Sequence, residues 1–205
     1  MIKTVVAILF VCLLFTSCSP PGIEEGHIIV QPDMVNNPVY KKLAKQKDFR
    51  DFTPDTTTFP KTSDVSYVNN RDRRLNDTTY SKFNKCKPYI ENGKLIINIG
   101  LNSGFTGTGF EINCDHAKFH IIPYYYTDMI MGGVETVSSY NIIQQKLILN
   151  KSKYVLGDSI FGYVDFKLIE NEKTIYKEDF PDKIENRKIT HIGKGYFRGK
   201  IEKSR

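Results

Sequence analysis

The sequence predicts an all-β fold arranged as an antiparallel sandwich, and two observations lead to it. Short runs of β-branched and aromatic residues that alternate with polar ones recur from about residue 86 onward. Glycine, proline and asparagine separate these runs at short intervals. Several short strands with a period of two, divided by frequent turn signals, are typical of antiparallel sandwiches. We therefore expect a β-sandwich over residues 86–205.

The strands expected in this region are taken from the alternating and β-branched runs. Gly100 ends the first of them, and the pair Gly132 and Gly133 breaks the pattern near the middle of the region. The expected strands are Lys94–Ile99, Phe110–Cys114, Lys118–Ile122, Tyr140–Leu149, Ser159–Ile169 and Gly195–Ile201.

Residues 27–85 predict a largely irregular arm that precedes the sandwich. Residues 38–49 can form one short helix, with Leu43 and Ala44 on its apolar side. Residues 53–76 are rich in Thr, Asp, Asn and Pro and have no sustained period. Such a composition favours an extended or partly disordered segment.

The most patterned segment spans residues 147–166. An apolar strand is followed by Tyr154, a turn at Gly157 and Asp158, and then an alternating run that ends at Phe166. This pattern resembles the first two strands of immunoglobulin-like sandwiches of the macroglobulin and arrestin kind. The resemblance implies an immunoglobulin-like sandwich whose alternating residues face the core, and it implies no activity.

The N-terminus has the pattern of an export signal. Lys3 precedes an apolar run of about a dozen residues, shorter than the roughly 20 that a membrane-spanning helix needs. The run ends in Phe15-Thr16-Ser17-Cys18, which resembles the lipobox of bacterial lipoproteins. The resemblance implies that residues 1–17 are removed and that Cys18 is acylated, palmitate included. Residues 18–26 are expected to form a tether, because Pro20, Pro21 and Gly22 disfavour any regular element.

The lipobox resemblance implies a protein of the cell envelope, held on a membrane by its N-terminal lipid. We favour the outer membrane over the inner one and leave its face open. Glu24 and Glu25 follow the cysteine closely, as in the surface-export signals of lipoproteins from the Bacteroides group.

The charge is basic, at +6 for the whole chain and +5 once Lys3 leaves with the signal. No aromatic-plus-basic recognition motif accompanies this charge, so we expect no nucleic-acid partner. An anionic envelope surface or an acidic partner suits the balance better.

Two cysteines, Cys86 and Cys114, remain after the signal and the lipidation site are assigned. In an oxidising compartment they are expected to form a disulfide. A metal site is the alternative, because Cys114, His116 and His120 lie within seven residues. This ligand set is one short of a standard zinc site, and we expect no metal and no cofactor.

The candidate binding surface is the aromatic triplet Tyr124, Tyr125 and Tyr126. Consecutive residues of a strand face opposite sides, so at least one of these tyrosines is expected to point outward. Exposed tyrosines combine apolar area with a hydroxyl, which suits a sugar or a protein partner.

Two motifs suggest enzymes, and the sequence argues against both. Gly157-Asp158-Ser159 looks like the first block of the GDSL hydrolases, but Lys188 stands where their Asp precedes the catalytic His, here His191. The glycines at 104, 107 and 109 suggest a phosphate loop, but neither the Lys-Ser/Thr nor the helix follows, and a hairpin loop is expected. No catalytic residues are assigned.

The function that the sequence favours is a non-catalytic binding or assembly module displayed at the membrane. The partner would be a protein or a glycan. The alternative is a periplasmic immunity protein that neutralises a toxin, for which the positive charge would suit an acidic toxin face. A hydrolase is the third possibility.

Overall fold

The computed structural model of the chain describes residues 25–49, 58–71, 81–83, 85–102, 106–127, 133–177 and 183–203. These residues form a mostly β structure with two short helices, which confirms the all-β expectation. The helices are η1 (Pro32–Asn36) and α2 (Pro38–Lys45). The strands are β1 (Gly26–Val30), β2 (Lys47–Phe49), β3 (Thr58–Pro60), β4 (Ser63–Asn69), β5 (Ser81–Phe83), β6 (Cys86–Glu91), β7 (Lys94–Asn102), β8 (Thr106–Asp115), β9 (Lys118–Thr127), β10 (Val134–Leu149), β11 (Ser159–Tyr176), β12 (Lys183–Lys200) and β13 (Glu202–Lys203).

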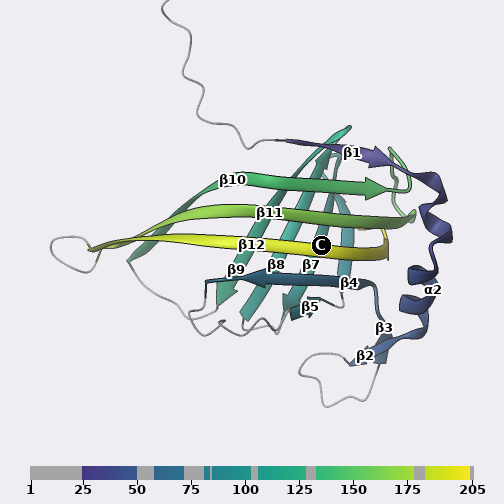
Figure 1. Cartoon of the computed structure of the whole chain (residues 1–205), viewed down its shortest axis with the longest axis horizontal. Coiled ribbons are helices and arrows are strands. Elements are labelled where there is room, and N and C mark those ends of the chain that lie inside the picture. Colours follow the sequence, from purple (N-terminus) through teal and green to yellow (C-terminus); the bar gives the residue numbers. More distant parts are fainter. Residues whose placement is uncertain are drawn as a thin grey trace, which may run out of the picture.

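Most strands belong to one sheet of the order β13-β6-β7-β8-β9-β1-β10-β11-β12-β4-β5. The sheet folds over on itself, so that β7, β8 and β9 cross behind β10, β11 and β12 (Figure 1). We call β13 and β6 to β9 the first half, and β10 to β12 with β4 and β5 the second half. The short strand β1 is the seam, because it pairs with β9 on one side and with β10 on the other.

The sheet is mixed, which corrects the expectation of a purely antiparallel arrangement. β1 runs parallel to β10, and β13 runs parallel to β6, whereas the other neighbours in this sheet are antiparallel. The parallel pairs arise because residues from both ends of the described chain join strands from its middle. Such long-range partners are not visible in local sequence patterns.

The core lies between the two halves. Alternation along β8 turns Phe110, Ile112 and Cys114 inward, and along β11 it turns Val164 and Phe166 inward. The rings of Phe110 and Phe166 meet edge to face, with centroids 4.8 Å apart. These contacts hold the first half against the second.

The N-terminal region contributes more to the sheet than an irregular arm would. β4 pairs with β12 and places Val65 and Tyr67 in the core. The helix expected over residues 38–49 is shorter, because α2 ends at Lys45 and Lys47–Phe49 form β2. It begins at Pro38, after the Asn37 side chain caps the backbone N–H of Val39, and it buries Tyr40 and Leu43 but not Ala44. The predicted arm is therefore structured where residues 27–49 and 58–71 are described.

Helix α2 covers the outer face of the second half near the start of β11 (Figure 1). Tyr40 is buried there, with its ring packed edge to face on Phe161 at 5.1 Å. The Tyr40 hydroxyl donates to the carbonyl oxygen of Gly162 over 3.0 Å. The helix is thus fixed to the sheet by packing and by one buried hydrogen bond.

Residues 147–166 form the expected strand, turn and strand. β10 and β11 pair antiparallel, and the Tyr154 hydroxyl donates to Asn150 Oδ1 over 2.8 Å at the turn. Gly157 has φ of +89°, a conformation that glycine adopts without strain. Asp158 accepts a hydrogen bond from the backbone N–H of Val155. The position of this turn and the residues that form it were therefore predictable from the sequence.

Candidate functional site

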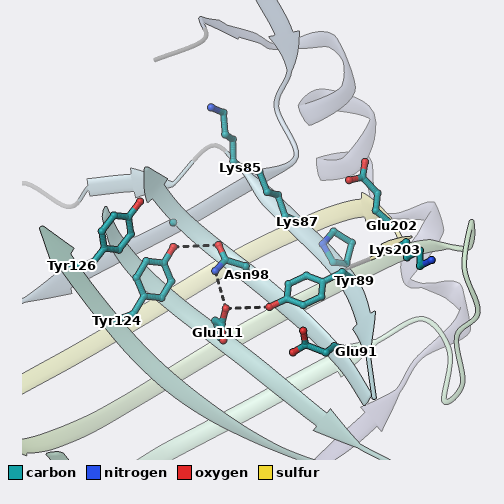
Figure 2. Close-up of a pocket in the computed structure, with 12 residues that line it drawn as sticks. Lys85, Lys87, Tyr89, Glu91, Asn98, Glu111, Tyr124, Tyr126, Glu202 and Lys203 are labelled. Carbon is teal, nitrogen blue, oxygen red and sulfur yellow. Dashed lines mark hydrogen bonds between the residues drawn. The ribbon is translucent and has the colours of Figure 1, made fainter. Parts of the chain in front are cut away.

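A hollow of about 900 Å³ lies on the outer face of the first half, away from the core. Asn98 faces it from β7, between the core residues Ile97 and Ile99, and Glu111 faces it from β8. Figure 2 shows the side chains that converge on this hollow. The lining residues are Lys85, Lys87, Pro88, Tyr89, Glu91, Asn98, Gly100, Glu111, Tyr124, Tyr126, Glu202 and Lys203.

A chain of hydrogen bonds crosses the hollow (Figure 2). The Tyr124 hydroxyl donates to Asn98 Oδ1 over 3.2 Å, and Asn98 Nδ2 donates to Glu111 Oε1 over 3.1 Å. The Tyr89 hydroxyl lies 3.4 Å from the same Glu111 oxygen. Burial raises the pKa of Tyr124 to about 12, so its hydroxyl stays neutral and able to donate. The chain holds four side chains from four strands in one arrangement.

Two tyrosines from β9 form one wall of the hollow. The rings of Tyr124 and Tyr126 lie side by side, with centroids 6.4 Å apart and planes 24° apart (Figure 2). Each ring lies against a glycine of the neighbouring strand. A Cβ on Gly107 would stand 2.1 Å from the Tyr126 ring, and one on Gly109 would stand 2.7 Å from the Tyr124 hydroxyl. The glycines therefore leave the space in which these rings lie.

The charged residues of the hollow balance one another. Three lysines line it at positions 85, 87 and 203, and three glutamates at 91, 111 and 202. Glu111 lies between Asn98 and Tyr89 (Figure 2), and the lysines stand on β6, β13 and the segment before β6. The lining therefore has no net charge.

The predicted tyrosine surface is divided between two faces. Tyr124 and Tyr126 line the hollow, and Tyr126 is 38% exposed. Tyr125 projects from the opposite face, is 49% exposed, and has the Arg71 guanidinium over its ring at 5.4 Å. The alternation of strand residues predicted this division.

The predicted disulfide between Cys86 and Cys114 is wrong, because both thiols are free and buried. Cys86 lies opposite Ile99 and Cys114 lies opposite Leu95, on the two sides of β7. The two cysteines are offset by four residues along the strands, about 13 Å, and by two strand spacings, about 10 Å. The Cα atoms of bridged cysteines lie within about 7 Å of each other, so these two are too far apart for a disulfide. Burial raises the pKa of the Cys114 thiol to about 12 and raises that of Cys86 further.

The alternative metal site is not assembled in the described residues. Cys114 points into the core, whereas His120 lies between the core residues Phe119 and Ile121 and faces outward. His116 is in the turn, where its Nδ1 lies 2.6 Å from Asp115 Oδ1. Nowhere in the described ranges do three His, Cys, Asp or Glu side chains gather as metal ligands do.

The two enzyme-like motifs resolve into structural roles. Gly107 and Gly109 belong to β8 and not to the expected hairpin loop, and they make room for Tyr126 and Tyr124. Gly104 lies outside the described residues. Ser159 pairs with Lys200 and His191 pairs with Leu168, so the serine and the histidine stand nine positions apart along β11. At about 3.4 Å per residue they lie about 30 Å apart and cannot act together.

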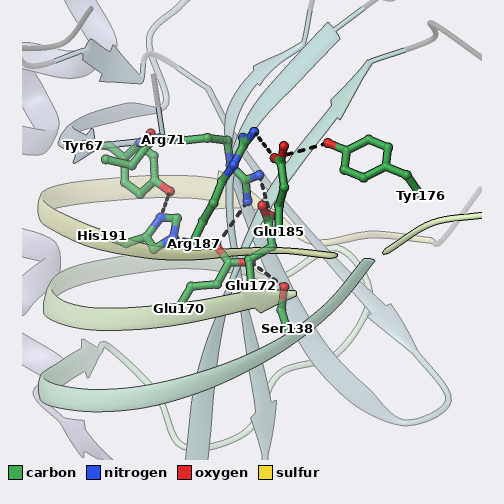
Figure 3. Close-up of polar contacts among 10 residues, drawn as sticks. Tyr67, Arg71, Ser138, Glu170, Glu172, Tyr176, Glu185, Arg187 and His191 are labelled. Carbon is green, nitrogen blue, oxygen red and sulfur yellow. Dashed lines mark hydrogen bonds and ion pairs between the residues drawn. The ribbon is translucent and has the colours of Figure 1, made fainter. Parts of the chain in front are cut away.

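A second polar cluster is buried within the second half (Figure 3). His191 Nε2 lies 2.8 Å from Glu170 Oε2, and its Nδ1 lies 2.7 Å from the Tyr67 hydroxyl. Arg71 donates to Glu170 and, over 2.6 Å, to Glu172. We call the set the Glu170 cluster, and its members are Tyr67, Arg71, Ser138, Glu170, Glu172 and His191.

The Glu170 cluster is internally paired and not open to a ligand. Glu170 and His191 are 4% and 2% exposed. Both Glu170 oxygens accept hydrogen bonds, Oε1 from Ser138 and Oε2 from Arg71. Groups buried and paired in this way specify a structure rather than form a binding site.

Tyr89, Asn98 and Glu111 were not predicted from the sequence as parts of the hollow. A polar residue at every second position of two apolar strands marks their outer face, but the sequence does not reveal which strands lie beside β9.

The predicted lipidation site, Cys18, lies outside the described residues. No helix in the described part of the chain is long and apolar enough to cross a membrane. No family model, curated protein or solved structure matches this chain.

Proposed function

We propose that this chain is a lipid-anchored protein of the cell envelope whose β-domain is a non-catalytic binding module. One observation carries the binding role, namely the hollow in which Tyr124 and Tyr126 stand beside Asn98 and Glu111. Concave surfaces that combine aromatic walls with a few fixed polar groups are the usual form of ligand sites. The lipid anchor is proposed from the lipobox-like residues that end at Cys18.

The immunoglobulin-like topology inferred from residues 147–166 belongs to the same proposal. The antiparallel β10–β11 hairpin and the inward positions of Ile160, Val164 and Phe166 support it. An immunoglobulin-like domain would act here as a rigid support that presents the hollow.

The anchor is tested by labelling cells with radioactive palmitate. We expect the label on the wild-type chain and on Cys12→Ala, and its loss in Cys18→Ala, because Cys18 supplies the acylated sulfur. The Cys18→Ala protein should also leave the membrane fraction. A label that persists in Cys18→Ala would show that lipid is attached elsewhere or that the signal is of another kind.

The binding role is tested by site-specific photo-crosslinking in the native envelope. A benzophenone amino acid replaces Tyr126 in the full chain, and Tyr125 in a matched control on the opposite face of the same strand. We expect adducts in high yield from position 126 and few from position 125, since a ligand in the hollow touches one face of β9. Equal yields from the two positions would contradict a binding role for the hollow.

A further inference from the structure

We propose that the hollow binds a neutral saccharide, an inference that rests on the proposed function and names its ligand class. Three features of the hollow lead to this class, namely its aromatic wall, its free hydrogen-bonding groups and its balance of charge. Each feature is compatible with several ligands, and their combination favours an uncharged ring that carries several hydroxyls.

The aromatic wall supplies an apolar surface formed by two neighbouring rings. Tyr124 and Tyr126 lie side by side 6.4 Å apart, and Tyr126 is 38% exposed (Figure 2). The C–H face of a pyranose ring is apolar and packs on an aromatic ring, and an oligosaccharide presents such faces in succession. The two neighbouring rings therefore fit a chain of sugars better than a single small solute.

The groups beside this wall leave hydrogen-bonding capacity for hydroxyls. Glu111 Oε1 accepts from Asn98 and Tyr89, whereas no described residue donates to its Oε2. Asn98 Nδ2 gives one of its two protons to Glu111 and retains the other. A carboxylate acceptor next to an amide donor matches two adjacent hydroxyls of a sugar, each of which donates and accepts.

The charge of the hollow disfavours ions of either sign. An anionic group such as a phosphate would approach the Glu111 carboxylate, which accepts from Asn98 and Tyr89 within the hollow. On the β6–β13 side the lining holds Lys87 and Lys203 together with Glu91 and Glu202, so an ion of either sign meets a like charge there. A neutral ligand avoids both repulsions, because like charges at short distance cost free energy.

The glycines next to the two tyrosines help to hold both rings in place before a ligand binds. The Tyr126 ring occupies the space that a Cβ on Gly107 would fill, and Tyr124 is held by its hydrogen bond to Asn98. Binding to groups already in place loses less conformational entropy than binding to mobile ones.

The test is calorimetric titration of the full mature chain in a zwitterionic detergent without a sugar head group. The probes are neutral hexasaccharides of glucose, mannose, galactose and N-acetylglucosamine, with inorganic phosphate and an anionic hexagalacturonate as charged controls. We expect at least one neutral hexasaccharide to bind, with an affinity that changes little between 0.05 M and 0.5 M salt, because no ion pair forms.

Three variants assign the binding to the hollow. We expect Tyr126→Ala and Gly107→Ala each to weaken it by about tenfold, since one removes the ring and the other displaces it, and tenfold corresponds to about 1.4 kcal/mol. Tyr125→Ala, the control on the opposite face, should bind as the wild type does. Unchanged thermal unfolding of each variant shows that the fold is intact.

Several results would overturn the ligand class. They are the absence of binding by every neutral hexasaccharide, stronger binding of phosphate or hexagalacturonate, or equal affinities for Tyr126→Ala and Tyr125→Ala. If position 126 still crosslinks in the envelope while no saccharide binds, the ligand class fails and the binding function stands. If crosslinking at position 126 fails as well, both proposals fail.

Discussion

Glu170→Ala is expected to lower the free energy of unfolding by about 3–5 kcal/mol, the usual cost of removing one partner of a buried ion pair. Glu170 is 4% exposed, and its two oxygens accept hydrogen bonds from Ser138, Arg71 and His191. Alanine leaves the His191 Nε2 and the Ser138 hydroxyl without this acceptor, and it leaves a cavity. Urea unfolding followed by circular dichroism measures the loss.

The effect of Glu170→Ala depends on pH in a defined direction. Burial alone raises the pKa of the Glu170 carboxyl, but hydrogen bonds from His191 and Ser138 and the charge of Arg71 outweigh it and hold the pKa below 4.5. A depressed pKa means that the stabilisation is complete above 4.5 and is lost as the pH falls through the folded value. The difference between wild type and Glu170→Ala should therefore shrink in acid.

Glu135→Ala is the matched control for Glu170→Ala. Glu135 Oε2 lies 2.7 Å from Lys177 Nζ, but the side chains are 51% and 57% exposed, so water replaces what the substitution removes. We expect little change in stability at any pH. A loss for Glu170→Ala no larger than that for Glu135→Ala would show that the Glu170 cluster does not stabilise the fold.

Phe166→Ala is expected to cost about 3–5 kcal/mol, because a large buried ring is replaced by a cavity between the two halves of the sheet. Phe166 is 1% exposed and meets Phe110 of the first half at 4.8 Å and Tyr67 of β4 at 6.4 Å. Urea unfolding of Phe166→Ala, Phe110→Ala and the double variant also gives the coupling of the two rings, expected at about 0.5–1.5 kcal/mol.

Phe161→Ala provides the comparison on the same strand. Phe161 is half-buried on the opposite face of β11, against Tyr40 of α2, so its removal should cost less than that of Phe166. Equal losses from the two variants, or additive effects of Phe110→Ala and Phe166→Ala, would contradict packing of the two halves through this pair of rings.

Strands and turns were predictable here because their signals are local. Alternation around Phe110–Cys114 and the turn at Gly157 and Asp158 identified β8 and the β10–β11 hairpin. The strand β4 was hidden by the polar composition of its surroundings, although Val65 and Tyr67 alternate with polar residues and face the core. Tertiary pairing with β12 makes this segment a strand, and a local pattern does not reveal such a partner.

The candidate site was predictable in part for the same reason. Tyr124 and Tyr126 could be found because one tyrosine-rich strand is visible by itself. Asn98 and Glu111 reach them through the register of β7, β8 and β9, and this register is a property of the folded sheet. The disulfide prediction failed on the register as well, since β7 lies between the two cysteines and they pair with residues four positions apart along it.

The seam strand β1 has a mechanical consequence. It is five residues long, follows the N-terminal segment directly, and joins the two halves through β9 and β10. A force applied to the chain ahead of Gly26, as a membrane attachment would apply it, draws β1 lengthwise and loads its hydrogen bonds to β10 in shear. Under the proposed lipid anchor, traction on the N-terminal segment would therefore load the seam between the two halves before it loads the halves themselves.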